Sequence, residues 1–507
     1  MLVWNKKNRK NKKRKSRRRT NLSYQTLERR QLLAVTASFT PGDLTFTGDL
    51  SPLGVDVELA VHPTTNELLW RQDNGQFTNN LNTAGIPQTY VMSPPGTVPV
   101  DPINVTIDLG DGNDSIQFDL DAWTGFKEVT VVDGGDYDFD TVNIVSGLDL
   151  LPAGGELNIQ AEETTVSTGV LVAASEGISI AGTGHDALIE IAENATLSAR
   201  TIMPGGDHHL DASVADSGSI KLTSKTITVA DGAGVIADVE FNSPFTAGDI
   251  EMSVSEDLPT SVELYDLLND IATGTASLPE AFNIFTQSAS ATIDIGAADI
   301  RASTIQMDAR VDSDTVIPTI SDIQDAVLNG GGVLLSLQMI SDYLSGELTE
   351  FLSATGVFAA WYVKEVTTSV VRIGDNANLD ADLDIVLSAT TKSKESNVVD
   401  NNIQAFAVTE VESNSKVTIG EGASLHAGND ILITTDAAIE SSAKAKTAKN
   451  LGLQVGPDRT AIAVAIAKSF LHSNINVAEN AVIRSGADLT LHAKGEQVVS
   501  ADAGAGV

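Results

Sequence analysis

The sequence predicts an all-β protein: a β-solenoid (β-helix-like) built from degenerate repeats, with an N-terminal β-hairpin region and two inserted amphipathic helical segments. Three observations carry this prediction. The 507 residues are 42 % apolar but only 5 % aromatic, which suits narrow stacked β-layers. Six segments share one phrase of alternating apolar and polar residues. None of them carries a large inward residue of the kind that fills the roughly 10 Å gap in a β-sandwich, the competing architecture.

The repeated phrase is clearest in "KVTIGEGASLHAGNDILITT", residues 416–435. In this copy Ile419 is followed by an alanine four residues later, by an aliphatic residue six residues later and, after a turn, by a further aliphatic pair. The other copies span residues 187–199, 225–237, 370–389, 474–493 and, with one residue deleted, 291–309. Alternation turns one face inward. Because so small a unit cannot close its own core, the copies must stack and share one.

Residues 1–37 are a basic tail followed by an export-like motif. Residues 1–30 hold 13 of the 32 Lys and Arg residues and a single acidic residue, Glu28, and a segment of this composition cannot bury a core. "LERRQLLA", which comes after the tail, resembles the LEPR-XLL motif at the start of very long bacterial surface and secreted proteins, with Arg29 where that motif has proline. The resemblance implies export, with Val35-Thr36-Ala37 as a small-residue cleavage site. The alternative is a disordered basic arm.

Residues 38–102 are predicted to form an antiparallel β region. Apolar and polar residues alternate around turn signals at Pro63-Thr64-Thr65 and Asp73-Asn74-Gly75, a pattern typical of hairpins. The segment "MSPPGTVPVDP" then has four prolines in eleven residues. This proline cluster predicts a boundary near residue 103.

Residues 103–255 are predicted to be solenoid with calcium-type turns. The segment from Gly110 to Ile116 resembles the second half of the glycine- and aspartate-rich nonapeptide of RTX proteins, and the segment from Gly134 to Val142 resembles it with one extra residue. In that family such turns present carbonyl and carboxylate oxygens to Ca²⁺. The resemblance implies Ca²⁺ as a cofactor, with these candidate metal ligands: Asp111, Asn113, Asp114, Asp136, Asp138 and Asp140. Ordinary turns between stacked strands are the alternative.

Residues 256–365 are predicted to hold the two helical insertions around one coil of the solenoid. Thr260 with Glu263, and Ser321 with Gln324, have the spacing of a capping box, and apolar residues come after each pair at helical spacing. We interpret these helices as a lid packed over one solenoid face. A binding lobe is the alternative.

Residues 366–507 return to the repeated phrase and add longer strands. In "AIAVAIA", residues 461–467, the alanines share one face, which would allow close approach by a neighbouring layer. The last copy of the phrase ends at Ala493, and the remaining residues start another strand without a polar cap. Since an uncapped solenoid exposes apolar side chains and strand edges, we expect the front portion of a longer or truncated chain. We also expect end-to-end self-association.

The chain offers little catalytic chemistry. It has no cysteine and no P-loop, G-x-S-x-G or H-E-x-x-H pattern. Asp207, His208, His209 and Asp211 come closest to a zinc-ligand set, but adjacent histidines on a strand point to opposite sides, which favours a polar loop. Beyond residue 30 the chain carries 19 basic against 67 acidic residues, a charge that repels nucleic acid. No apolar run reaches the roughly 18 residues of a transmembrane helix.

Two function classes remain. The body resembles filamentous haemagglutinin-like β-solenoid adhesins, which implies a non-enzymatic bacterial protein, extracellular or at the cell surface, that is adhesin-like or structural. Its partners would be cell-surface, extracellular-matrix or polysaccharide ligands. The alternative is a β-helical polysaccharide lyase or hydrolase. Such an enzyme needs Asp with Arg or Lys converging on one groove, and the basic residues beyond the tail are few and scattered.

Overall fold

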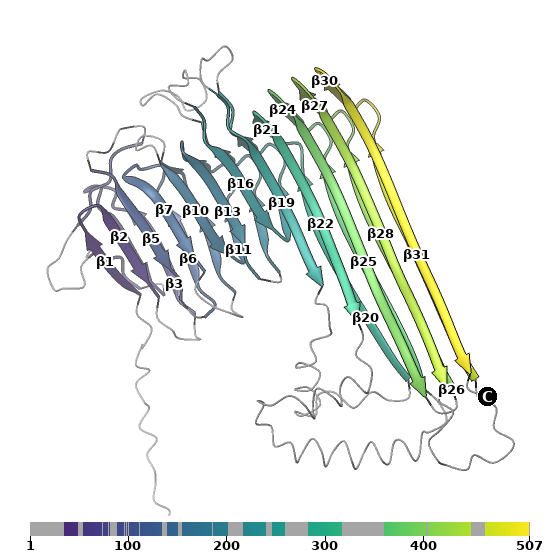
Figure 1. Cartoon of the computed structure of the whole chain (residues 1–507). Helices are drawn as coiled ribbons and strands as arrows, with labels where there is room; N and C mark the ends of the chain where they lie inside the picture. Colours follow the sequence, from purple (N-terminus) through teal and green to yellow (C-terminus); the bar gives the residue numbers. More distant parts are fainter. Residues whose placement is uncertain are drawn as a thin grey trace, which may run out of the picture.

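The protein forms a stack of β-coils that runs from its N-terminal to its C-terminal strands (Figure 1). The computed structural model describes residues 35–48, 54–73, 75–79, 81, 89–95, 97, 99, 101–110, 112–133, 139–150, 155–184, 186–200, 216–239, 246–258, 282–316, 359–401, 404–447 and 462–505. Within these residues the chain is all-β, with no helix, and so has no helical segment able to cross a membrane. The two predicted helical insertions lie outside the described residues.

Three sheets make up the stack. The twelve-stranded sheet contains, in spatial order, β1 (Thr36–Thr40), β2 (Asp43–Thr47), β5 (Ile103–Asp108), β7 (Phe126–Val132), β10 (Glu156–Ala161), β13 (Gly177–Gly182), β16 (Ser219–Ser224), β19 (Ile250–Leu258), β22 (Ile305–Val316), β25 (Ile385–Asn401), β28 (Ile431–Thr447) and β31 (Leu489–Ala505). The eleven-stranded sheet contains β29 (Ile462–Val477), β26 (Gln404–Ile419), β23 (Ala359–Ile373), β20 (Phe282–Ile295), β17 (Thr226–Val229), β14 (Leu188–Ile191), β11 (Glu163–Val166), β8 (Thr141–Ile144), β6 (Ser115–Asp119), β3 (Asp56–Val61) and β4 (Leu68–Gln72). The eight-stranded sheet contains β30 (Val482–Ser485), β27 (Ser424–Ala427), β24 (Asn378–Ala381), β21 (Asp299–Ala302), β18 (Gly234–Ile236), β15 (Thr196–Ser198), β12 (Leu171–Ala173) and β9 (Leu148–Asp149).

Equivalent strands of successive coils pair in parallel, with the repeated phrase in register. Ile373 pairs with Ile419, which pairs with Val477. The same column continues through Val166, Ile191, Val229 and Ile295. The aliphatic residue six positions later forms a second column: Val172, Leu197, Val235, Ile300, Leu379, Leu425 and Ile483. Both columns are buried in all but the last coil, so the phrase, including its shortened copy at 291–309, predicted the stacking correctly.

One left-handed residue closes the turn between the eleven-stranded and eight-stranded sheets in most copies of the phrase. It lies three residues after the column residue and is always Asn or Gly: Asn194 (φ 59°), Gly232 (φ 72°), Asn376 (φ 60°), Gly422 (φ 68°) and Asn480 (φ 61°). These are the residue types that tolerate a positive φ, which explains why they recur in the phrase. The shortened copy turns through Gly296-Ala297-Ala298 without a left-handed residue.

Two antiparallel hairpins cover the N-terminal end of the stack. β1 pairs with β2 and β3 pairs with β4, while β2 and β3 also pair in parallel with β5 and β6 of the next coil. The β3–β4 turn falls at the predicted Pro63-Thr64-Thr65. Val35 and Ala37, part of the predicted cleavage site, are buried in the hydrophobic core. The same core runs on past residue 103 to Ile433 without a break.

The stack has two parts, which we call the body and the blade. In the body all three sheets enclose the core. From β19 onward the strands of the twelve- and eleven-stranded sheets lengthen. These two sheets therefore extend together beyond the eight-stranded sheet (Figure 1). This two-layer extension is the blade. It comprises residues 282–289, 311–316, 359–369, 391–401, 404–415, 435–447, 462–473 and 493–505.

The interior of the blade differs from that of the body. Its apolar cluster is separate and consists mainly of alanine: Trp361, Val363, Val399, Ala405, Ala407, Ala443 and Ala445. Between this cluster and the body lies a belt of buried polar residues, which we call the polar seam: Glu365, Thr367, Ser369, Thr391, Ser393, Glu395, Asn397, Thr409, Ser413, Ser415, Thr435 and Ser441. Ala463, Ala465 and Ala467 of "AIAVAIA" pack against the alanine cluster, as their shared face predicted.

Candidate functional site

The two segments that resemble calcium turns lie on neighbouring coils of the body. Ile116 pairs with Val142, and the amide N–H of Thr141 donates to the carbonyl oxygen of Asp114 at 2.9 Å. Asp114 and Asp140 therefore occupy equivalent corners, just before β6 and β8. Separated by a whole coil in sequence, the two residues are stacked directly in the fold.

Three acidic residues form a hydrogen-bonded ladder at this corner. The amide N–H of Val55 donates to Asp114 Oδ1, that of Asp114 to Asp140 Oδ1 at 2.8 Å, and that of Asp140 to Glu162 Oε2 at 2.7 Å. All three carboxylates are buried, at 3 %, 0 % and 6 % exposure. Each one caps a backbone N–H of the coil before it, and this capping is a structural role that needs no ion.

The corner also gathers carboxylates into a candidate metal centre. Asp133, at the end of β7, joins Asp140 and Glu162, and one oxygen of each lies within 4.8 Å of the others. Calcium holds its oxygen ligands at 2.3–2.6 Å, so ligands on opposite sides of the ion are separated by about 5 Å. The spacing and the all-oxygen donor set therefore suit Ca²⁺ or another hard cation.

The sequence identified this site only in part. Asp114 and Asp140 lie at the corner, whereas the side-chain oxygen of Asn113 is exposed and accepts the amide N–H of Phe139 at 3.1 Å. Asp111, Asp136 and Asp138 lie outside the described residues, as do Asp207, His208, His209 and Asp211. Asp133 and Glu162 were not among the ligands predicted from the sequence. Glu162 comes just before β11, in which the inward residue Thr164 pairs with Val142 of β8. Because this inward residue is polar, β11 cannot be recognised in the sequence as part of a repeat.

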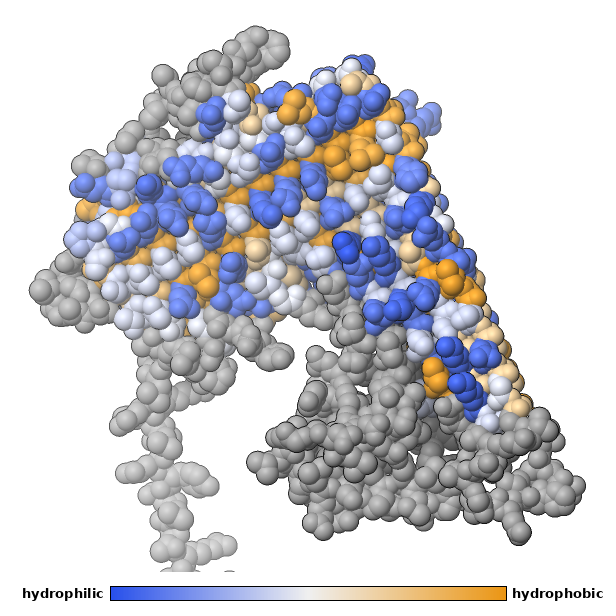
Figure 2. All heavy atoms as spheres, viewed as in Figure 1, coloured by the Kyte–Doolittle hydropathy of each residue, from blue (hydrophilic) through white to orange (hydrophobic). Residues whose placement is uncertain are grey.

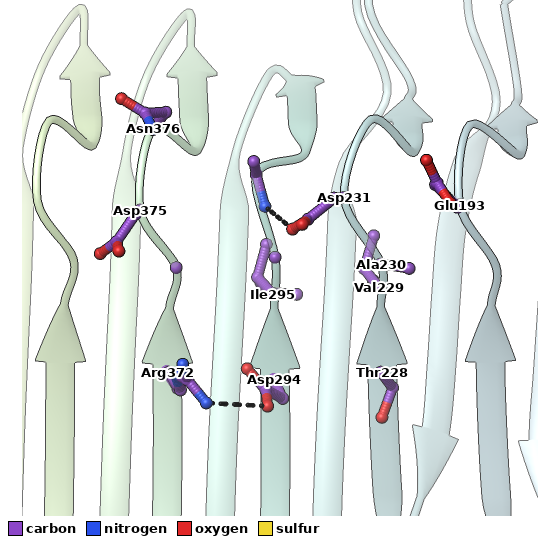
Figure 3. A pocket seen from close by; sticks show the side chains of 13 residues that line it. Glu193, Thr228, Val229, Ala230, Asp231, Asp294, Ile295, Arg372, Asp375 and Asn376 are labelled. Carbon is purple, nitrogen blue, oxygen red and sulfur yellow. Dashed lines mark hydrogen bonds and ion pairs between the residues drawn. The ribbon is translucent and has the colours of Figure 1, made fainter.

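A second candidate site is a groove of about 680 Å³ on the surface of the stack (Figure 3). It opens over the shortened turn at Gly296-Ala297-Ala298. Because this turn lacks one residue and carries only small side chains, it leaves a hollow between the turns of the neighbouring coils. The deletion in the repeated phrase thus marks the position of the groove.

Charged groups from four coils line this groove. Its polar walls are formed by Glu193, Asp231, Asp294, Arg372, Asp375 and Asn376, with Arg372 as the single basic residue of the lining. The guanidinium of Arg372 lies 3.4 Å from Asp294, and both side chains are largely exposed (Figure 3). Such an exposed pair contributes little to stability, so its groups can be given up to a ligand. Asp231 Oδ1 and Asp375 Oδ1 instead accept backbone N–H groups of Ala297 and Glu421, at 2.8 and 2.7 Å.

No protein family, curated protein or solved structure matches this chain. The stack, the acidic corner and the groove are therefore the features that bear on its function.

Proposed function

We propose that this protein is a non-enzymatic, secreted or cell-surface β-solenoid of a bacterium, with an adhesin-like or structural role. The observation that supports this most is the single aliphatic core that links coil after coil in register. A stack of this kind gives length and surface rather than an enclosed active site. Outside the basic tail its charge is strongly acidic, which favours solubility and repels nucleic acid.

The surface is consistent with presentation to an aqueous exterior. Figure 2 shows polar and charged side chains over most of the described face, with bands of apolar residues running across the strands between them. Extracellular or surface location rests on the resemblance of "LERRQLLA" to an export motif. Since Val35 and Ala37 belong to the core, any processing cut that leaves the fold intact must fall before Val35.

Location can be tested in intact cells of the source bacterium. We expect external protease to remove the antibody signal for this protein while a cytoplasmic marker stays protected. Replacing Leu32 and Leu33 of the export-like motif by Asp should trap the chain inside, because a charged pair destroys the short apolar segment. A wild-type chain that stays inside with the marker would rule out the proposed location.

Binding to polysaccharide is the proposed adhesin-like activity, and the groove provides a matched pair of variants. Arg372 in the groove and Arg310 on β22, outside the groove, are both exposed and both paired with an aspartate. If the groove binds acidic polysaccharide, R372Q should weaken binding at least tenfold in an immobilised-glycan assay, whereas R310Q should not. An equal loss of binding in both variants would show that binding depends on the positive charge of exposed arginines in general and not on the groove.

The groove also favours one alternative function, a β-helical polysaccharide lyase or hydrolase. Asp294 and Arg372 converge there with Asp231, and acid–base chemistry on an acidic sugar requires this combination. Incubation with uronate-containing polysaccharides, followed by measurement of reducing ends and unsaturated products, separates the two functions. Product formation by the wild type that D294N abolishes would establish the enzyme and overturn the non-enzymatic proposal.

We further propose that the acidic corner binds Ca²⁺. Asp133→Asn is the sharpest test, because Asp133 belongs to the cluster, whereas the three backbone N–H groups of the ladder donate to Asp114, Asp140 and Glu162. Equilibrium dialysis should show one Ca²⁺ fewer bound than in the wild type, while D119N on the exposed side of β6 should change nothing. An unchanged count in D133N would leave only the structural capping role.

The last described coil favours a second copy of this chain as a partner, through end-to-end self-association. Its strands β29 and β31 expose Ile466, Phe470, Leu489 and Leu491 at 42–50 %, and Figure 2 shows a pale to orange edge along β31. Unpaired strand edges with apolar side chains promote pairing between chains. Light scattering of the 507-residue chain should show concentration-dependent oligomers that L489K/L491K reduces. A monomer at all concentrations would contradict this proposal.

A further inference from the structure

Two buried carboxylates occupy the polar seam of the blade. Glu365 on β23 is 0 % exposed and Glu395 on β25 is 1 % exposed. No inward-facing Lys or Arg lies among the described residues of the blade. Gln287 Nε2 donates to Glu365 Oε2 at 3.1 Å, whereas neither carboxylate oxygen of Glu395 has a hydrogen-bond partner among the residues that the structure describes. Burying the charged form of Glu395 without a counter-charge is strongly unfavourable, so this carboxylate must be neutralised by a proton or by a bound cation.

Two bridges between the strands place the carboxylates opposite each other. On one side, Thr367 Oγ1 and Ser393 Oγ are 2.7 Å apart. On the other side, Asn397 Nδ2 donates to the carbonyl oxygen of Trp361 at 3.4 Å. Since β23 and β25 run in opposite directions in facing sheets, Glu395 lies opposite the two inward residues of β23 between the bridges, Val363 and Glu365, and the charge of Glu365 acts on it.

Neutral oxygens surround this pair. Asn397 Oδ1, Thr409 Oγ1 and Ser441 Oγ are all buried, and none of them has a hydrogen-bond partner within the described part of the chain. The amide group of Asn397 is oriented by its Nδ2, which also donates to the carbonyl oxygen of Val408 at 3.2 Å, next to Thr409 on β26. Ser441 pairs in register with Glu395. Three strands thus bring oxygen atoms to one place.

A shared proton and a bound cation are the two ways to neutralise the pair, and the neutral oxygens distinguish between them. A proton shared by Glu365 and Glu395 would satisfy the carboxylates but would leave Asn397 Oδ1, which can only accept, without a partner. A hard cation takes six to eight oxygen ligands and would satisfy the two carboxylates and Asn397 Oδ1 together. Mg²⁺ fits poorly because it keeps several waters, whereas the side chains here are almost completely buried.

We propose that the polar seam is a second cation site, selective for Ca²⁺ and similar hard ions, in which Glu365, Glu395, Asn397 Oδ1 and Thr409 Oγ1 are ligands. The ion would tie the twelve-stranded sheet to the eleven-stranded sheet within the blade. Because the ligands are enclosed, binding is coupled to folding or to local opening of the blade. Burial, together with repulsion from Glu365, raises the pKa of Glu395 to about 8, and the bound ion would reverse this shift.

Terbium reports this site directly, because Tb³⁺ takes the oxygen sites of Ca²⁺ and emits when a nearby tryptophan is excited. Trp361 lies on the inward face of β23 that also carries Glu365. The full chain is loaded with Tb³⁺ just below its melting temperature, so that the blade can open. We expect sensitised emission that excess Ca²⁺ displaces, and a melting temperature higher in Ca²⁺ than in EGTA.

The variants separate this site from the acidic corner. E395Q should abolish both the sensitised emission and the part of the Ca²⁺ stabilisation that remains in D133N/D140N. W361F should lose only the emission and keep the stabilisation, with circular dichroism confirming that both variants fold. The proposal is overturned if E395Q retains the Ca²⁺ stabilisation present in D133N/D140N. It is also overturned if D133N/D140N gains no stability from Ca²⁺ and its pH dependence is identical in Ca²⁺ and EGTA, which is the result expected for a shared proton.

Discussion

The body and the blade share strands and register but differ in what fills them. In the body, three sheets enclose inward residues such as Ile419 and Leu425, both 0 % exposed. In the blade, the same β26 and β28 continue as two facing layers lined by Ala405, Ala407, Ala443 and Ala445. Three sheets around a core leave room for branched side chains at every inward position, whereas two layers in close contact favour small ones at most positions.

The comparison shows that register and interior chemistry are specified separately. Backbone pairing continues without interruption from Ile385↔Ile431 to Asn401↔Thr447, although the interior changes along the way from aliphatic to polar to alanine. Parallel backbone hydrogen bonds are the same for every residue type. A solenoid can therefore change its interior from one part of a strand to the next without losing its stack.

The largest expected effect concerns the aliphatic column of the body. Ile431 is 1 % exposed, whereas its neighbour Leu432 on the outer face is 37 % exposed. Ile431→Lys buries an unpaired ammonium group and should lower the free energy of unfolding by several kcal/mol. Leu432→Lys should cost less than about 0.5 kcal/mol. Denaturant unfolding measures both, and equal losses would mean that the column is not the core of the body.

The next effect is a pH dependence of the free energy of unfolding, which we expect from the polar seam and not from the aliphatic core of the body. The pKa of Glu395 is raised to about 8 from 4.5 in the folded protein. A raised pKa means that its contribution to stability is complete below about 4.5 and is lost as pH rises through about 8. In EGTA the free energy of unfolding should fall by up to about 1.4 kcal/mol per pH unit within this window.

Glu365 is the titratable group that faces Glu395, and the other inward neighbours on the strands packed around it are neutral: Gln287, Asn397, Thr409 and Ser441. E395Q should therefore flatten the pH profile measured by urea unfolding between pH 5 and 9. Ca²⁺ should flatten it in the wild type as well, because the ion keeps both carboxylates ionised. A slope in E395Q equal to that of the wild type would place the titration elsewhere.

A smaller effect tests how closely the two layers of the blade approach each other. Ala407 is 0 % exposed and lies in the alanine cluster, so Ala407→Leu overpacks the interface and should cost about 1–3 kcal/mol. Ala438→Leu, on the outer face of β28, is the matched control and should stay within about 0.5 kcal/mol. Thermal unfolding followed by circular dichroism compares the two. If the stability of A407L equals that of the wild type, the two layers of the blade are not closely packed, and the contrast with the body does not hold.

The smallest effect concerns the left-handed turn of the body. Gly422 has φ 68°, and the equivalent residues of the coils on either side are Asn376 and Asn480. Gly422→Ala should cost about 1–2 kcal/mol because a Cβ is strained at this φ. Gly422→Asn should cost clearly less, since asparagine tolerates the conformation. If the two substitutions prove equally costly in denaturant unfolding, crowding against Asn376, rather than the dihedral angle, controls the position.

Alternation in the sequence was sufficient to predict the body because its inward positions are aliphatic and its outward positions polar. The deletion at 291–309 was also visible in the sequence. The groove that results from it was not, because the groove depends on the turns of neighbouring coils. The polar seam could not be predicted. In "TTKSKESN", residues 390–397, both faces of the strand are polar, so alternation cannot distinguish the inward Glu395 from the outward Lys394. At the acidic corner the sequence singled out Asp114 and Asp140 but not Asp133 and Glu162, which belong to no recognisable copy of the phrase.

The coils differ in length, and this gives the stack a mechanical signature. Equivalent turn residues are 46 positions apart between one pair of coils and 58 between the next. The hydrogen bonds between coils run along the stack, so a pull on its two ends loads them in series and peels coils off one at a time. Each released coil adds its own contour length, about 160 Å for the shorter and about 200 Å for the longer. Single-molecule stretching would therefore record an uneven series of steps in which each coil is recognised by its length.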